Sequence, residues 1–103
     1  MKAQILTLAA ALLLASTAHA SSDQAWAEHD RQLLRACTKA SQLKEVRALG
    51  KSAEFDDRSG YSALLLQGRY PQKHMNNRKG TELCLYDRRQ KSAYVTEWTP
   101  GKP

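Results

Sequence analysis

Long hydrophobic runs, internal repeats and cysteine-rich motifs are all missing from this chain. It has 103 residues and only two cysteines, with no Cys-x-x-Cys pair of the kind used for redox chemistry or metal binding. Its stretch of apolar and small residues at 5–15 is shorter than the roughly 20 apolar residues that span a membrane. A chain this short also lacks room for a cofactor-binding α/β domain, so we expect one small domain with no cofactor.

Residues 1–20 differ in character from the remainder of the chain. Lys2 precedes the apolar stretch, and Ala18-His19-Ala20 follows it, which is the arrangement of a Sec-type signal peptide. We therefore expect 1–20 to be a cleaved signal peptide and 21–103 to be a single exported domain. Its location would be the periplasm or the extracellular medium, with no transmembrane segment after signal removal.

The two cysteines, Cys37 and Cys84, are expected to form a disulfide. Exported proteins fold in an oxidising compartment, and two thiols allow one intramolecular pairing. Closing a loop of this length stabilises the fold by roughly 4 kcal/mol in the chain-entropy model.

The first part of the domain has the spacing of an amphipathic helix over 23–40. Ser21 and Gln24 fit a capping box, and an apolar stripe follows at helical intervals. Its members are Trp26, Leu33, Cys37 and Ala40.

The spacing of the apolar residues changes after residue 42, and the pattern of the residues that follow predicts an antiparallel meander. We expect strands at 43–55, 61–68, 81–87 and 92–98, with a bulge or bend near Gly50 in the first. A loop at 69–80 would join the middle strands, and 99–103 would form a tail. The predicted fold class is therefore α+β, with the helix packed on one face of a sheet of about four strands and one disulfide.

The net positive charge of the expected domain is concentrated in residues 69–91. Seven basic residues lie there against Glu82 and Asp87, whereas acidic and basic residues balance elsewhere in 21–103. Because a loop before a strand and a turn after it lie at opposite ends, roughly 20 Å apart, these residues predict a basic edge rather than one tight pocket. The seven are Arg69, Lys73, Arg78, Lys79, Arg88, Arg89 and Lys91.

The function favoured by this pattern is an exported, non-enzymatic binding module for an anionic partner. An acidic protein or an anionic envelope component would suit the charge, and nucleic acid is disfavoured by the compartment and the lack of a recognised binding motif. The oligomeric state is left open. The expected binding residues are Arg69, Tyr70, Lys73, His74, Arg78, Lys79, Arg88 and Arg89, with Met75 as a further contact.

Other functions remain as alternatives. A small secreted hydrolase, ribonuclease-like in its chemistry, would use His74 as a base with a glutamate and an arginine. A hydrolase inhibitor or a structural envelope protein are further possibilities. The residue spacings predict no catalytic constellation and no metal site.

Overall fold

A computed structural model describes residues 22–99 of the protein. The expected signal peptide at 1–20 lies outside this range, as does the expected tail beyond Thr99. The chain divides into two units between Arg31 and Gln32, and each is described by itself.

Residues 22–40 are helical, close to the predicted range of 23–40. In the first unit, Arg31 pairs with Glu28 at 2.6 Å, and Trp26 is 63% exposed although the apolar stripe predicts an inward-facing residue. In the second unit, Leu33 and Cys37 are buried against the sheet. The helix ends where the amide of Ser41 donates to the carbonyl of Cys37 at 3.0 Å.

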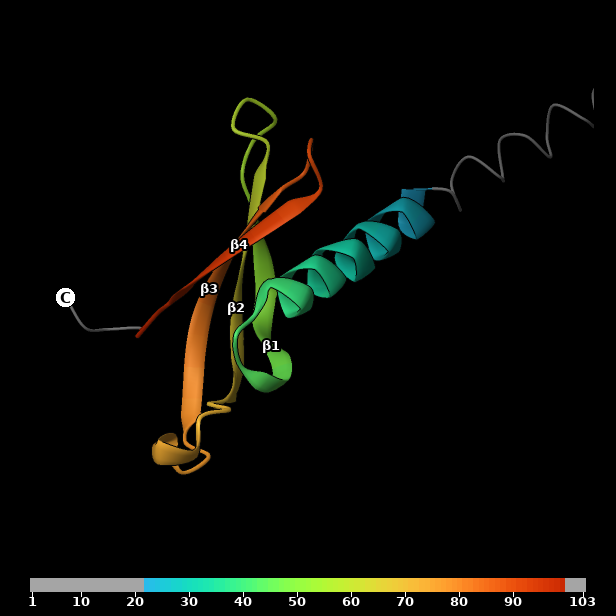
Figure 1. The fold of residues 1–103 in the computed structure, drawn as a ribbon. Helices are drawn as coiled ribbons and strands as arrows, with labels where there is room; N and C mark the ends of the chain where they lie inside the picture. The colour runs from blue at the N-terminus through green and yellow to red at the C-terminus, as the bar shows by residue number, and fades with distance from the viewer. Residues whose placement is uncertain (1–21, 100–103) are drawn as a thin grey trace, which may run out of the picture. The chain divides into compact units, whose positions relative to one another are not determined.

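The remainder of the second unit contains one antiparallel sheet, whose four strands follow one another in chain order (Figure 1). The strands are β1 (Lys44–Glu54), β2 (Tyr61–Arg69), β3 (Lys79–Asp87) and β4 (Ser92–Glu97). The structure thus confirms the predicted α+β fold, with a helix packed on a four-stranded antiparallel meander.

The connection between β2 and β3 differs from the predicted loop at 69–80. Arg69 pairs with Lys79 in the sheet, and the amide of Tyr70 donates to the carbonyl of Arg78 at 2.9 Å. Strand pairing therefore continues beyond the predicted strand ends, and the loop is limited to residues 70–78. It contains a single short helix, η1 (Lys73–Met75).

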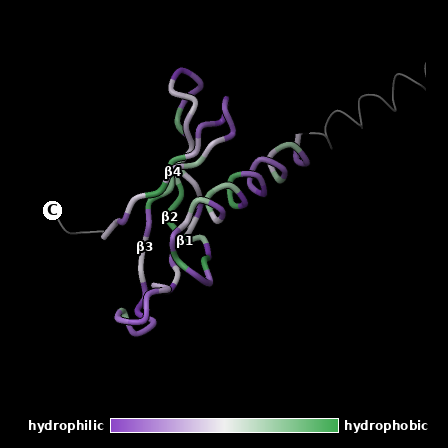
Figure 2. The backbone as a smooth tube through the Cα atoms, in the orientation of Figure 1, coloured by the Kyte–Doolittle hydropathy of each residue, from purple (hydrophilic) through white to green (hydrophobic). Residues whose placement is uncertain are grey.

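The core lies between the second half of the helix and one face of the sheet. On β2 the side chains alternate, with Ser62, Leu64 and Leu66 buried on this face and their neighbours half-buried on the other. Figure 2 shows hydrophilic hairpin ends and more hydrophobic strand centres. The buried apolar residues are Leu33, Cys37, Leu64, Leu66, Cys84 and Tyr86.

The predicted disulfide is confirmed, and it lies within this core. Cys37 and Cys84 are both fully buried and bonded, with their Cα atoms 5.9 Å apart. The bond joins the last turn of the helix to the centre of β3. Among the described residues, no helix is both long and apolar enough to cross a membrane.

Candidate anion-binding site

Three cationic side chains from three neighbouring strands lie together at one end of the sheet. Arg47 on β1 pairs with Gln67 on β2, and Arg69 pairs with Lys79 on β3. Residues opposite each other in an antiparallel sheet project on the same side. Since Leu66, next to Gln67, faces the core, all four side chains lie on the face that the helix does not cover, called the outer face below.

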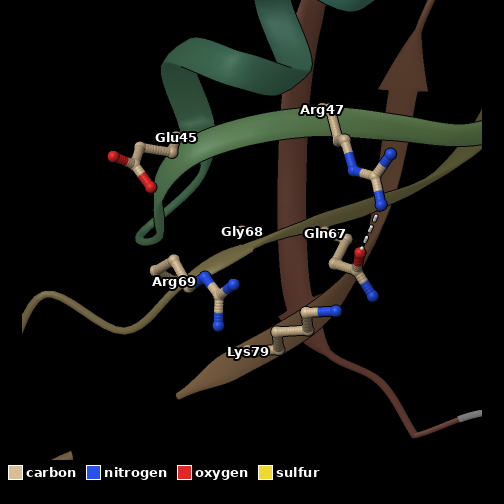
Figure 3. A pocket seen from close by; sticks show the side chains of 6 residues that line it. All are labelled: Glu45, Arg47, Gln67, Gly68, Arg69 and Lys79. Atoms are coloured by element: carbon tan, nitrogen blue, oxygen red, sulfur yellow. Dashed lines mark hydrogen bonds between the residues drawn. The ribbon is translucent and has the colours of Figure 1, made fainter. Parts of the chain in front are cut away.

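These side chains surround a hollow of about 260 Å³ (Figure 3). The hollow lies beside a bulge in β1 between Lys44 and Arg47, where Glu45 adopts a positive φ of 55°. Bulges reorient the side chains around them, and here the strand regains regular pairing at Arg47. The hollow is lined by Glu45, Arg47, Gln67, Gly68, Arg69 and Lys79.

The positive charge around the hollow is mostly uncompensated. Arg47 donates to the side-chain oxygen of Gln67 at 2.9 Å, and Arg69 donates to the carbonyl of Asn77 at 3.2 Å. Both acceptors are neutral. The side chain of Lys79 is exposed and makes no hydrogen bond or ion pair to another described residue. Among the described residues, Glu45 is the one carboxylate that lines the hollow, and in Figure 3 it points away from Arg47.

The loop at 70–78 adds further exposed charge at the same end of the β2–β3 hairpin. Lys73 and His74 lie on η1, and Arg78 directly precedes β3; all three are exposed. Arg78 makes one long bond to the carbonyl of Met75, at 3.4 Å. Four of the predicted binding residues, Lys73, His74, Arg78 and Lys79, therefore lie exposed at one end of the sheet.

Tyr70 belongs to the opposite face, away from the hollow. Its ring lies where a side chain on Gly80 would project, 2.9 Å from the position of the missing Cβ, and its hydroxyl donates to Glu97 at 3.2 Å. Burial raises the pKa of Tyr70, and the hydrogen bond to Glu97 adds to this effect. Its geometry is that of a packing residue.

Arg88 and Arg89 lie at the other end of the β2–β3 hairpin, next to Tyr61. Tyr61 is eight residues from Arg69 along β2, which corresponds to roughly 27 Å. Arg88 donates to the carbonyls of Tyr61, Phe55 and Asp56. Arg89 donates to the carbonyl of Asp57 at 2.7 Å. Both guanidinium groups thus tie the β3–β4 turn to the β1–β2 connection, and the structure does not bring them together with Arg69 and Lys79.

Arg47 and Gln67 are absent from the binding residues predicted from sequence. Charge counted along the chain favours the contiguous segment 69–91, whereas Arg47 comes from β1 through the sheet register. The alternation of β1 could have indicated its face, but the bulge at Lys44–Arg47 interrupts that alternation.

Neither a protein family, nor a curated protein, nor a solved structure matches this chain. We therefore infer the function from the geometry and charge of the described residues.

His74, the predicted base of the hydrolase alternative, is exposed on η1. Within residues 22–99 no hydrogen bond orients its ring, whereas a general base requires a partner that holds it toward the substrate. In the same range, no three His, Cys, Asp or Glu side chains are close enough to hold a metal ion.

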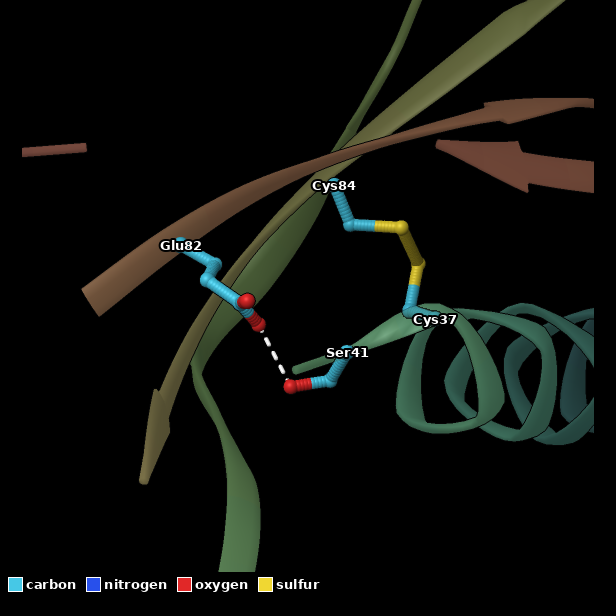
Figure 4. The surroundings of a disulfide bond; sticks show 4 residues. All are labelled: Cys37, Ser41, Glu82 and Cys84. Atoms are coloured by element: carbon cyan, nitrogen blue, oxygen red, sulfur yellow. Dashed lines mark hydrogen bonds between the residues drawn. A yellow bond between two sulfur atoms is a disulfide. The ribbon is translucent and has the colours of Figure 1, made fainter. Parts of the chain in front are cut away.

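Glu82 is the one buried carboxylate among the described residues, at 3% exposure. It accepts a hydrogen bond from the hydroxyl of Ser41 at 2.5 Å (Figure 4). It accepts a second from the backbone amide of Gln42 at 3.1 Å. These bonds hold the chain where it leaves the helix, four residues after the disulfide at Cys37. We assign Glu82 a structural role, since both of its oxygens are used within the fold.

Proposed function

We propose that this chain is an exported, non-enzymatic binding module that takes an anionic partner at the cationic end of its outer face. The observation that carries this proposal is the placement of Arg47, Arg69 and Lys79 on three adjacent strands around one hollow, with a single carboxylate beside them. The three positive charges repel one another when the hollow is empty. An anion bound among them relieves this repulsion and is attracted by all three.

Export is supported by the residues 1–20 and by the disulfide. A bonded pair of cysteines persists in the periplasm or outside the cell, where thiols are oxidised. The anionic partner would accordingly be an acidic protein or an anionic component of the envelope.

The proposal is tested with fluorescein-labelled poly-L-glutamate as the probe and anisotropy as the readout. The variant Arg47→Gln/Arg69→Gln/Lys79→Gln removes the three charges of the hollow. Exposed charge pairs contribute from about 0.2 to about 1 kcal/mol each, so we expect the three together to contribute about 2 kcal/mol, and their loss should raise Kd roughly 30-fold in low salt. Binding to the unmodified protein should weaken between about 0.01 M and about 0.15 M salt, since the Debye length falls from roughly 30 to 8 Å.

A matched control is available on other parts of the fold. Arg35→Gln/Lys39→Gln/Lys51→Gln removes the same charge from exposed side chains away from the hollow. If the two triple variants bind the probe equally, net charge alone explains the binding and the site is not the one proposed.

A further inference from the structure

The outer face of the sheet is apolar next to the cationic hollow. Leu49, Leu65 and Leu83 form one row of directly paired residues across β1, β2 and β3. None of the three is buried. An antiparallel sheet with one solvated face commonly carries polar side chains there, so this row is unusual for a surface that meets only water.

A second row extends the apolar surface toward β4. Ala63 pairs with Leu85, and Leu85 pairs with Tyr94. Leu85 is 39% exposed and Tyr94 is 59% exposed. Large apolar side chains of adjacent strands are thus exposed side by side, which is the pattern of a docking surface rather than of scattered surface residues.

Trp98 adds an aromatic ring to the same face. Its amide donates to the carbonyl of Thr81 at 2.9 Å, which continues the register by one pair beyond Glu82 and Glu97. Trp98 therefore shares the face of Thr81, and it is 46% exposed. Tyrosine and tryptophan side chains are enriched where an apolar phase meets a polar one.

The apolar rows and the cationic hollow are continuous along the strands. From Leu65, β2 reaches Gln67 and then Arg69 within roughly 13 Å on the same face. A partner that covers this face must therefore present an apolar region and, beside it, negative charge.

A second copy of the chain meets only half of this requirement. It would bring its own uncompensated cations, whereas Asp87, a carboxylate on the outer face, is already held by the amides of Arg89 and Gln90 at 2.9 and 3.2 Å. An anionic lipid surface offers both negative head groups and an apolar boundary beneath them.

We infer that the outer face docks on the surface of an anionic lipid bilayer, with Arg47, Arg69 and Lys79 at the phosphates and the leucine rows and Trp98 at the apolar boundary. This inference rests on the proposed function, because it specifies what anion the hollow takes. The side chains Lys73 and Arg78, in the loop at 70–78, would add charge beside the same head groups.

The test uses the processed protein purified after export, in a Trp26→Phe background that leaves Trp98 as the only tryptophan. Sedimentation with mixed phosphatidylglycerol/phosphatidylcholine vesicles gives the affinity, and pure phosphatidylcholine vesicles serve as the uncharged control. We expect binding to the charged vesicles alone, with the emission of Trp98 shifted to the blue. The triple variant of the hollow should bind roughly a hundredfold more weakly.

The leucine rows are tested by Leu83→Thr/Leu85→Thr, which retains strand-favouring residues on a partly exposed face. Vesicle affinity should fall about tenfold, whereas affinity for poly-L-glutamate should remain unchanged. A thermal melt of the variant establishes that it is folded. The emission of Trp98 in the protein with unchanged leucines tests contact with the apolar boundary independently of this variant.

Three results would overturn the inference. If the leucine variant binds vesicles as well as its parent and the Trp98 emission stays unshifted, charge alone holds the protein at the lipid. If poly-L-glutamate binds more tightly than the vesicles, the partner is an acidic protein. In both cases the anion-binding function stands, whereas binding to neither probe removes that function as well.

Discussion

Replacing Arg88 by methionine should destabilise the fold and leave anion binding intact. The Arg88 side chain is 21% exposed, and its Nη1 donates to the carbonyl of Tyr61 and to the hydroxyl of the fully buried Ser62. Its Nη2 donates to the carbonyls of Phe55 and Asp56 at 2.8 and 3.2 Å. Methionine retains most of the aliphatic stem and removes every one of these bonds.

The cost follows from the burial of the acceptors. Two of the four hydrogen bonds, those to Tyr61 and Ser62, are partly buried, and the loss of each lowers the free energy of unfolding by about 1–1.5 kcal/mol. The exposed carbonyls of Phe55 and Asp56 can bond to water instead, so the loss of their bonds costs less. We expect a decrease of about 3 kcal/mol in the free energy of unfolding. In a domain of this size that corresponds to a decrease of roughly 12–24 °C in Tm.

Chemical denaturation and thermal melting measure the stability, and poly-L-glutamate anisotropy measures the binding. Arg58→Met is the matched control in the neighbouring turn, because the Arg58 side chain is 93% exposed and pairs only with Asp56 among the described residues. It should change stability by less than about 0.5 kcal/mol. An Arg88→Met variant that melts like its parent, or that loses the probe while remaining stable, would refute the division between structural and binding arginines.

Two further predictions concern the end of the sheet near the loop at 70–78. Gly68→Ala should cost about 2 kcal/mol in denaturant unfolding, because its Cβ would lie 2.7 Å from the carbonyl oxygen of Lys44 and 2.9 Å from Leu43; unchanged stability would contradict this packing. Because the pKa of Tyr70 is raised in the fold, its stabilising contribution should be complete below pH about 10 and be lost as pH rises through the folded pKa. Ultraviolet titration should therefore show a late phenolate step that Tyr70→Phe removes, and an early step would contradict the hydrogen bond from Tyr70 to Glu97.

The architecture of the domain could be predicted because the helix and the strands follow from local residue patterns, and the disulfide follows from there being only two cysteines. Helical spacing places Leu33 and Cys37 on one stripe, and the period-two pattern after residue 42 marks the strands. The pairing of Cys37 with Cys84 needs no geometry, since no third cysteine competes.

The candidate site could be predicted only in part, because it is assembled by tertiary structure. Arg69 and Lys79 lie in the charged segment, but Arg47 joins them through a bulged strand. The charge of Arg88 looks equivalent in sequence, yet the β1–β2 connection folds beneath it and supplies carbonyl acceptors. Counting charges along the chain reveals neither the arrival of Arg47 at the hollow nor the hydrogen bonds that hold Arg88.

The apolar outer face illustrates a further limit. The central strand β2 carries the run Leu64-Leu65-Leu66, which places apolar side chains on both faces of the sheet. Which face the helix covers depends on the packing of Leu33 and Cys37. Leu65 is left on the uncovered side.

The central claim is that the hollow at Arg47, Arg69 and Lys79 is where anions bind. Its most direct test is a map of backbone amide shifts in an NMR titration of the protein with poly-L-glutamate. We expect the largest shifts at Arg47, at 67–69 and at Lys79, with little change at 88–91. Shifts centred on 88–91, or spread evenly over the sheet, would contradict it.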